Sequence, residues 1–277
     1  MSALAGREIV LGVTGSIAAY KAVYLLRELV REGARVTVCL SAHAGEFVTP
    51  LTFRTLSGRP VLTDLFDPRS PEAVEHVALA ERAAAVLVAP ATANLLGKAA
   101  QGLADDALTT LLLAARGPVV MAPAMDGGMW DHPAVVANVA TLRQRGVVVL
   151  EPDVGPLASG LSARGRLPEV DAILDALRTA LGPRDLAGER VLVTAGPTRE
   201  PIDPVRYLSN RSSGRMGYAL AAAAARRGAT VTLVSGPTAL TPPATVAFVP
   251  VETAEEMREA VLQHAEAATV VIKAAAV

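Results

Sequence analysis

The residues best placed to do chemistry in this chain of 277 residues directly follow apolar runs. Asp126 lies in the stretch PAMDGGMW, which follows the apolar run 118–122 and contains the only tryptophan. Open α/β sheets bind their ligands beyond the carboxyl ends of the strands. Asp126 is therefore either a cap of the loop or part of a site, and its own surroundings in the sequence leave both interpretations open.

Two other polar turns predict an edge that binds phosphate. The segment GVTGSIAAYK, residues 12–21, leads from an apolar run into a helical pattern, where glycines allow close approach and a helix amino terminus offers free N–H groups. It lacks the spaced three-glycine fingerprint, and the next strand ends at Ser41 without an acid for an adenine ribose. We expect a mononucleotide whose phosphate is held by hydroxyls such as those of Ser16 and Ser41; an ordinary strand-to-helix turn is the alternative. The turn APATAN, with Thr92 and Asn94, favours the nucleotide because it reaches the same edge.

Strand and helix patterns alternate along the chain, and the alternation begins twice. Helical patterns separate short apolar runs, which predicts a parallel sheet with right-handed crossovers. The first series of runs comprises residues 8–13, 35–40, 85–89, 118–122 and 146–150, and the second comprises the strands 190–194 and 230–234 around the helix 217–227. The predicted fold class is α/β: a Rossmann-like domain with a parallel sheet in residues 1–183, then the first part of a second Rossmann-like α/β domain in residues 184–277. Residues 152–166, rich in glycine and small side chains, fit neither strand nor helix and are expected to form a lid or a mobile connection.

The net charge, the cysteine count and the lack of a long apolar span exclude several classes of protein. The formal net charge of −1 gives no general attraction to nucleic acid or to acidic membranes, so anion binding has to be local. One cysteine, Cys39, excludes an intramolecular disulfide and a cysteine cluster for metal, and no metal site is expected. No leader pattern and no long apolar span is present, which predicts a soluble cytoplasmic protein.

Several ionisable residues have structural interpretations. Asp105 and Asp106 precede a helical pattern and are expected to cap its first turn rather than to catalyse. A single histidine such as His76 is ordinarily a satisfied surface or core residue. In the second half, the arginines outnumber the acids of one glycine- and serine-bearing loop, which predicts phosphate binding. The arginines are Arg199, Arg206, Arg211 and Arg215, and the acids are Glu200 and Asp203.

Five motifs, taken in order, resemble the flavin-dependent cysteine decarboxylases: GVTGSIAAYK, EHVAL, APATAN, KAAQGLADD and PAMDGGMW. Residues 194–217 resemble the phosphopantothenate–cysteine ligases. Together the two sets resemble the family of bifunctional coenzyme A biosynthesis flavoproteins over nearly the whole chain.

For the first domain, the resemblance implies an FMN-dependent carboxy-lyase that acts in coenzyme A biosynthesis. The substrate would be 4′-phosphopantothenoylcysteine, oxidised to a thioaldehyde, decarboxylated to an enethiolate and reduced to 4′-phosphopantetheine. His76 takes the position of the active-site histidine, and the flavin site lies between subunits of a homo-oligomer built from trimers. The expected cofactor-binding residues are Gly15, Ser16, Ile17, Ser41, Ala91, Thr92, Asn94, Ala124 and Met125.

For the second domain, the resemblance implies a ligase that uses CTP and Mg²⁺ to form an acyl-cytidylate of 4′-phosphopantothenate, which then accepts cysteine. Asn210 takes the position of a residue that handles the acyl-cytidylate. The residues expected to contact substrate or CTP phosphate are Arg166 in the first domain and Gly196, Thr198, Arg206, Ser212, Ser213 and Gly214 in the second. The chain stops at residues 272–277, before the rest of the family's ligase site, so we expect this half to be incomplete and without ligase activity.

Two positions depart from the resembled family. Asp126 replaces an asparagine that holds the substrate carboxylate, and Ser159 replaces a cysteine that protonates the enethiolate. An ionised Asp126 repels a carboxylate unless it is protonated or paired, and Arg164 and Arg166 are the nearest cations in sequence. Serine is a far weaker acid than a thiol, and a missing general acid slows a reaction roughly 10²- to 10⁴-fold.

Three functions from different classes therefore remain. The first is a complete decarboxylase in which water or another side chain supplies the proton, which the attached ligase half favours. The second is a flavoprotein that stops at oxidative decarboxylation, or an oligomer that binds FMN without turnover. The third is a nucleotide-binding ligase fragment that binds CTP.

Overall fold

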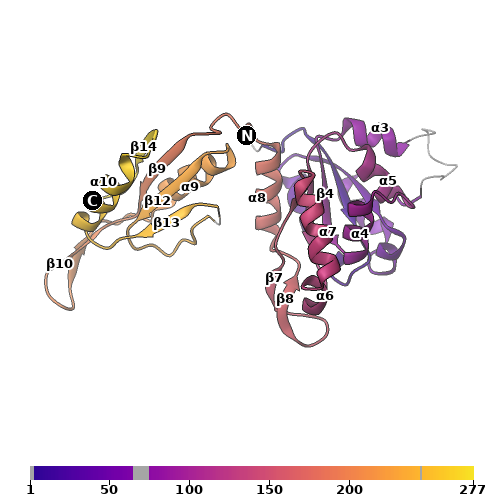
Figure 1. Cartoon of the computed structure of the whole chain (residues 1–277), viewed down its shortest axis with the longest axis horizontal. Helices are drawn as coiled ribbons and strands as arrows, with labels where there is room; N and C mark the ends of the chain where they lie inside the picture. Colours follow the sequence, from indigo (N-terminus) through magenta and orange to yellow (C-terminus); the bar gives the residue numbers. More distant parts are fainter. Residues whose placement is uncertain (1–2, 65–74, 244) are drawn as a thin grey trace. The chain divides into compact units, whose positions relative to one another are not determined.

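The computed structural model describes residues 3–64, 75–243 and 245–277. The chain forms two units, Met1–Leu181 and Gly182–Val277, each with a sheet of its own (Figure 1).

A parallel sheet forms the centre of the first unit and confirms the predicted fold class. Its order within the described residues is β3-β2-β1-β4-β5-β6, and every pair is parallel. The chain moves outward from β1 in one direction and then from β4 in the other, so the order reverses between these two strands. Loops beyond their carboxyl ends therefore diverge and leave a crevice. The strands are β1 (Glu8–Val13), β2 (Arg35–Leu40), β3 (Val61–Leu62), β4 (Ala85–Ala91), β5 (Val119–Pro123) and β6 (Val148–Val149).

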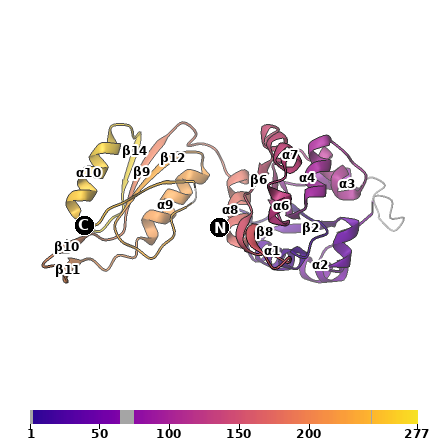
Figure 2. The same cartoon turned by 60° about the horizontal axis from the view of Figure 1, so that its bottom comes forward.

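Helices cover both faces of this sheet (Figure 2). One face packs against α1 (Ala19–Arg31), α2 (Pro50–Ser57) and α8 (Val170–Leu181). The other packs against α3 (Glu75–Arg82), α4 (Ala93–Gln101), α5 (Ala107–Ala114) and α7 (Pro133–Gln144). The short helices η1 (Ala42–Glu46) and α6 (Gly127–Trp130) follow β2 and β5.

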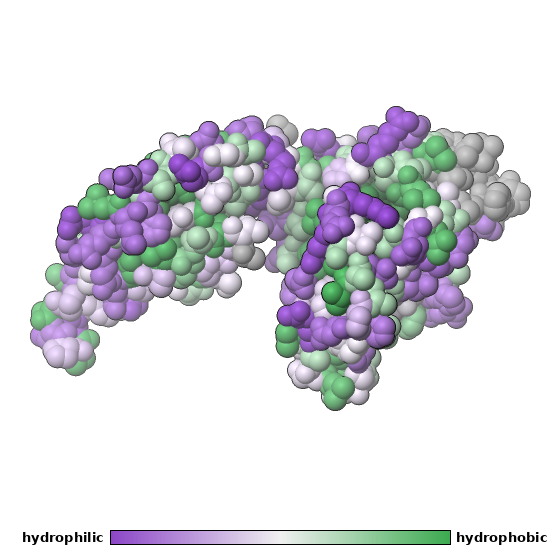
Figure 3. Space-filling model, viewed as in Figure 1, coloured by the Kyte–Doolittle hydropathy of each residue, from purple (hydrophilic) through white to green (hydrophobic). Residues whose placement is uncertain are grey.

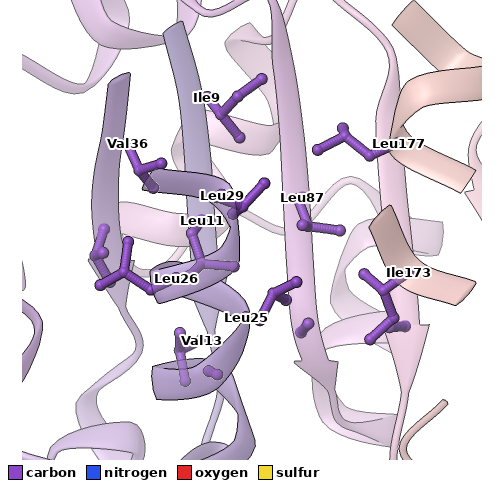
Figure 4. Packing of buried hydrophobic residues seen from close by; sticks show 14 of the residues in the cluster. Ile9, Leu11, Val13, Leu25, Leu26, Leu29, Val36, Leu87, Ile173 and Leu177 are labelled. Atoms are coloured by element: carbon purple, nitrogen blue, oxygen red, sulfur yellow. The ribbon is translucent and has the colours of Figure 1, made fainter. Parts of the chain in front are cut away.

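Alternation along the strands divides the apolar side chains between the two faces. In β1, Ile9 and Leu11 pack in the cluster beneath α1 and α8, whereas Val10 packs in the cluster on the opposite face. Figure 4 shows Leu26 and Leu29 of α1 directed at these strands. The continuous apolar runs of the sequence arise because the strands are buried on both faces.

The segment 152–166 is a β-hairpin, so the prediction that it contains no regular structure is wrong. It consists of β7 (Asp153–Pro156) and β8 (Ser162–Arg166), paired antiparallel. The strands are short and only one of their residues is buried, and their backbone groups bond to one another rather than to the main sheet. Such a ribbon needs little apolar alternation, which is why the sequence pattern did not indicate it.

The second unit repeats the parallel design on a smaller scale. Its sheet has the order β13-β12-β9-β14, all parallel. Two helices, α9 (Arg215–Arg226) and α10 (Ala254–Ala265), bury their apolar sides against it. The strands are β9 (Arg190–Ala195), β12 (Thr230–Ser235), β13 (Ala247–Pro250) and β14 (Val270–Lys273).

An antiparallel arm projects from the second unit. It is formed by β10 (Arg199–Pro201) and β11 (Tyr207–Ser209). The arm exposes Ile202, Val205 and Leu208, and its tip carries hydrophobic surface in Figure 3. In the described ranges, no helix has the length and apolar character needed to cross a membrane.

Replacing Leu87 by alanine tests the packing of the first unit. Leu87 is fully buried in β4, and its loss leaves a cavity between the sheet and the helices, so Leu87→Ala should lower the free energy of unfolding by about 2–5 kcal/mol. Trp130, the only tryptophan, is buried in this unit and reports its unfolding by fluorescence during urea titration. Leu113→Ala is the control, because Leu113 is 58% exposed. Equal effects of the two substitutions would contradict the packing described here.

Candidate functional site

The crevice between β1 and β4 is closed at its base by Thr14. This buried residue donates its hydroxyl hydrogen to the carbonyl of Pro90 at 2.8 Å, and the same oxygen accepts from the backbone N–H of Thr92 at 3.1 Å. These bonds fix the polar turn after β1 against the one after β4. Thr14 was not among the predicted site residues, although it lies within the same polar motif, residues 12–21.

A cavity of about 780 Å³ opens above this junction. Its volume falls within the range of about 300–1,000 Å³ typical of small-molecule sites. The cavity brings together seven of the nine residues expected to bind the cofactor: Gly15, Ser16, Ser41, Thr92, Asn94, Ala124 and Met125. Ala91, in contrast, is buried in β4 and does not line it.

The turn before α1 contributes Gly15 and Ser16 to this cavity. The Ala18 N–H donates to Ser16 Oγ at 3.2 Å, and the Ala19 N–H donates to the Ser16 carbonyl at 2.9 Å. A turn that leads into a helix start favours an anion through the N–H groups that remain available. Gly15 is required by space here, because a Cβ on it would lie 2.5 Å from His43 Cβ.

A second cavity, of about 500 Å³, adjoins the first and shares Ser16, Ala124 and Met125 with it. It brings Ile17, Asp126, Ser159 and Arg166 together. Three parts of the chain thus meet at one place: the start of α1, the loop after β5 and the β7–β8 hairpin.

Asp126 is both the cap and the pocket residue that the sequence left as alternatives. It is the N-cap of α6, where its Oδ1 accepts from the Gly128 N–H at 3.1 Å. Its Oδ2 accepts from the hydroxyl of Ser159 at 2.7 Å. The hydrogen bond from Ser159, with a smaller contribution from Gly128, lowers the pKa of Asp126 below its usual value, so the carboxyl group is ionised at neutral pH.

The two arginines considered as partners of Asp126 have other partners. Arg166 pairs with Glu169, and Arg164 lies 3.9 Å from Glu151. Within the described residues, Asp126 has no ion pair with either. Asp126 and Ser159 instead contact each other, a pairing that the sequence separation of 33 positions gave no means to predict.

The hairpin packs closely on the Asp126 loop. The Met125 N–H donates to the Gly165 carbonyl at 2.9 Å, and a Cβ on Gly165, whose φ is +142°, would lie 2.2 Å from the Met125 oxygen. A Cβ on Gly127 would lie 2.8 Å from the Arg164 oxygen. The first glycine of PAMDGGMW is therefore required by the approach of β8.

Lys21 is a site residue that the sequence analysis missed. It lies on α1 and lines the second cavity, and its Nζ is buried with no hydrogen-bond partner among the described atoms. A buried unpaired ammonium group favours an anionic ligand. The signal available in the sequence was the position of Lys21 in the first turn of α1, directly after the polar motif.

The remaining predictions for the first unit have mixed outcomes. Asp106 caps α5 in a capping box with Thr109, as expected, whereas Asp105 pairs with Lys98 instead of capping. Cys39 is buried, which raises the pKa of its thiol. His76 falls in α3, but its side chain lies outside the described residues. The groups that the structure describes include no cluster of three His, Cys, Asp or Glu side chains suited to a metal ion.

In the second unit, the structure gathers only part of the predicted phosphate site. Gly214, the N-cap of α9, approaches Gly196: a Cβ on Gly214 would lie 3.3 Å from the Gly196 nitrogen. Ser212 accepts from the Gly214 N–H at 3.4 Å, and Ser213 and Asn210 are exposed nearby in sequence.

Two other members of that prediction have different environments. Thr198 is buried, and its carbonyl accepts from Ser209 at 2.7 Å. Arg206 lies on the arm and pairs with Asp203 at 2.7 Å. The structure therefore does not bring Arg206 to a phosphate position in the absence of a ligand.

Comparisons with known proteins match both units. Residues 2–182 match the family model described as Flavoprotein, and residues 186–277 match the one described as DNA/pantothenate metabolism flavoprotein C-terminal domain. The chain is 52% identical over 277 residues to the coenzyme A biosynthesis bifunctional protein CoaBC of Mycobacterium tuberculosis, covering 98% of this chain and 66% of that protein. It is 49% identical over 278 residues to the Bacillus subtilis protein of the same name, covering 99% and 68%. The chain thus spans about two thirds of the length of these curated relatives.

Solved structures show the same fold. The FMN-dependent cysteine decarboxylase SpaF is 33% identical with a TM-score of 0.56, covering 64% of this chain and 97% of its own. A mutant PPC decarboxylase complexed with pantothenoylaminoethenethiol is 28% identical with a TM-score of 0.56, covering 62% and 97%.

The two adjacent glycines of PAMDGGMW give a matched test of hairpin docking. Gly127→Ala forces the Arg164 backbone away and should destabilise the first unit by about 1–3 kcal/mol. It should also speed hydrogen exchange in residues 153–166. In Gly128→Ala, the new Cβ meets only Asp126 Oδ1, at 3.8 Å, so exchange in the hairpin should not change. Equal exchange in the two variants would show that the hairpin does not depend on this contact.

Proposed function

We propose that this chain, which belongs to the Flavoprotein family and to the family of bifunctional coenzyme A biosynthesis proteins, is an FMN-dependent decarboxylase of 4′-phosphopantothenoylcysteine. The observation that carries the proposal is the contact between two cavities at the β1/β4 crevice, which share Ser16, Ala124 and Met125. A cofactor in the larger cavity would border a substrate in the smaller one. Residues 1–183 would form the decarboxylase domain.

The larger cavity fits a flavin mononucleotide. The N–H groups before α1, with Ser16 and Ser41, would hold its phosphate, while Thr92 and Asn94 would bind polar groups of the rest of the molecule. A single phosphate-binding edge suits a mononucleotide better than a dinucleotide. When bound, FMN would supply the two-electron oxidation of the substrate thiol and the later reduction.

The smaller cavity supplies the substrate contacts. Asp126, Ser159 and Arg166 line it from the loop after β5 and from the hairpin segment. Lys21, whose ammonium group is buried, lines it from α1. The hairpin would exclude water above the reacting cysteine, since it rests on the Asp126 loop. His76, by its position in the motif, would act in the same reaction.

A second function remains because Ser159 donates its hydrogen to Asp126. In that arrangement the hydroxyl does not point its proton at a substrate, which favours either another proton source or a reaction that stops after oxidative decarboxylation. The neighbouring ligase-like unit favours the complete reaction, because a pathway enzyme has to release a usable product.

The second unit is proposed to be the corresponding part, residues 184–277, of a ligase for 4′-phosphopantothenate and cysteine. Gly196 and Gly214 would admit a CTP phosphate to the start of α9, whose N-cap has no side-chain hydrogen bond. Ser212 and Ser213 would contribute hydroxyls, Asn210 would contact the acyl-cytidylate, and Mg²⁺ would accompany the nucleotide. Arg206 would have to exchange Asp203 for the phosphate.

The products formed from 4′-phosphopantothenoylcysteine test the proposed activity. We expect the purified chain to bind FMN and to convert this substrate to 4′-phosphopantetheine and carbon dioxide, detected by mass spectrometry, with the flavin absorption returning to its oxidised form. An enethiol product with a bleached flavin would support the second function. Failure to release carbon dioxide would refute both.

We also propose a homo-oligomer built from trimers. Ile17, Tyr20 and Tyr24 have helical spacing along the start of α1 and are 59%, 51% and 59% exposed. Such an apolar stripe beside a cavity is typical of a surface that another subunit covers. The stripe borders the substrate cavity, to which Ile17 and Tyr20 contribute.

The mass in solution tests this assembly. Sedimentation equilibrium should give a multiple of three times 28.6 kDa, and Tyr24→Glu should shift the protein toward the monomer because it places a charge in the apolar contact. Leu262→Glu on α10 is the control, since Leu262 is equally exposed at 59% but lies in the second unit. A monomeric wild-type chain would contradict the proposal.

A further inference from the structure

We propose that Asp126 takes up one proton when a carboxylate-bearing substrate enters the smaller cavity, so that a neutral carboxyl group donates a hydrogen bond to that carboxylate. The inference rests on the proposed function, which brings such a substrate to this cavity. It assigns to Asp126 a specific chemical form in the bound state.

The geometry of the free protein defines the starting state. Both carboxylate oxygens of Asp126 accept hydrogen bonds, Oδ1 from the Gly128 N–H and Oδ2 from the Ser159 hydroxyl. The side chain has no donor of its own in this form, so it has only negative charge and lone pairs to offer a ligand. An incoming carboxylate would meet a group of the same sign.

The arginines around Asp126 do not relieve this repulsion. On β8, Arg164 lies near Glu151 and Arg166 pairs with Glu169. Beyond α6, the next ionisable residues are Asp131 and His132, and neither lines the cavity. From α1, Tyr20 and Lys21 line the cavity. Among the described lining residues, Lys21 is a cation whose buried Nζ has no hydrogen-bond partner, and it is the group that could compete with protonation.

Two carboxylates at hydrogen-bond distance ordinarily share a proton, because one of them then becomes a donor to the other. A neutral Asp126 would present a hydroxyl donor to the substrate carboxylate while its other oxygen still accepts. Binding therefore raises the pKa of the pair above that of free Asp126, and a proton enters from solvent.

Ser159 suits both forms of its partner. A hydroxyl donates to an ionised carboxylate and either donates to or accepts from a neutral carboxyl group, depending on its rotation. The 2.7 Å contact with Oδ2 can therefore persist through the change of protonation. A thiol at this position would be a weaker partner in both states, which gives a physical reason for finding serine opposite aspartate.

Calorimetric binding to the FMN-loaded chain tests the inference with two ligands. The first is 4′-phosphopantothenoylserine, which keeps the carboxylate but has no oxidisable thiol, and the second is 4′-phosphopantothenoylethanolamine, which lacks only the carboxylate. The ratio of their affinities cancels the titration of the shared phosphate. Between about pH 6 and pH 8, the affinity for the first relative to the second should fall about tenfold per pH unit, because one proton is bound with it. Titrations in buffers of different ionisation enthalpy should give an uptake of one proton for the first ligand alone.

Variants identify the group that titrates. Asp126→Asn should make the affinity ratio independent of pH, since the amide is already a neutral donor. Asp131→Asn removes an equal charge at the other end of α6, outside the cavity, and should leave the pH dependence intact. An affinity ratio independent of pH in the wild-type chain would overturn the inference and assign the substrate carboxylate to Lys21. Binding of neither ligand would instead refute the proposed function on which the inference rests.

Discussion

The structure of the first unit depends on one junction, where Thr14 bonds the end of β1 to the turn after β4. The strand order reverses at this point, so the connections on either side leave in opposite directions and cannot fill the space above it. Because the strands are parallel, every polar turn is delivered to the same edge. The hydroxyl of Thr14 holds the two central turns together, and other polar residues of these turns line the larger cavity. The bonds of Thr14 fix the two central turns to each other, and the diverging connections leave the space above them for the two cavities.

The smaller cavity depends on a different kind of constraint, the absence of side chains at two glycines. Gly127 and Gly165 let two backbones approach to distances that a Cβ would prevent, and the hairpin therefore rests directly on the Asp126 loop. The hairpin that approaches in this way also carries Ser159, whose hydroxyl donates to the carboxylate of Asp126. An acidic acceptor and a hydroxyl donor from distant parts of the chain thus form one local pair.

Much of the fold could be predicted from the sequence, because buried parallel strands leave continuous apolar runs. The bounds of β1 and β2 agree with the predicted runs, and the turns with Ser16 and Thr92 were correctly placed at one edge. The hairpin was missed because its short strands are held by their own backbone bonds and carry no apolar periodicity. The Asp126–Ser159 contact and the burial of Lys21 depend on packing between distant segments, which local pattern does not encode. The carboxylate of Asp126, for which the sequence left a cap or a site open, caps α6 and also lines the smaller cavity.

The single, buried cysteine of the sequence, Cys39, makes the chain suitable for site-directed labelling. It is the only cysteine of the sequence, it lies buried in β2, and its raised pKa keeps it as a thiol that electrophilic reagents do not readily reach. The chain therefore resembles the cysteine-free backgrounds that are usually prepared for site-directed labelling. A spin label or fluorophore attached through a cysteine introduced at an exposed position would report from that position alone. The arm of the second unit and the tip of the hairpin could each be followed in this way without removing a native residue.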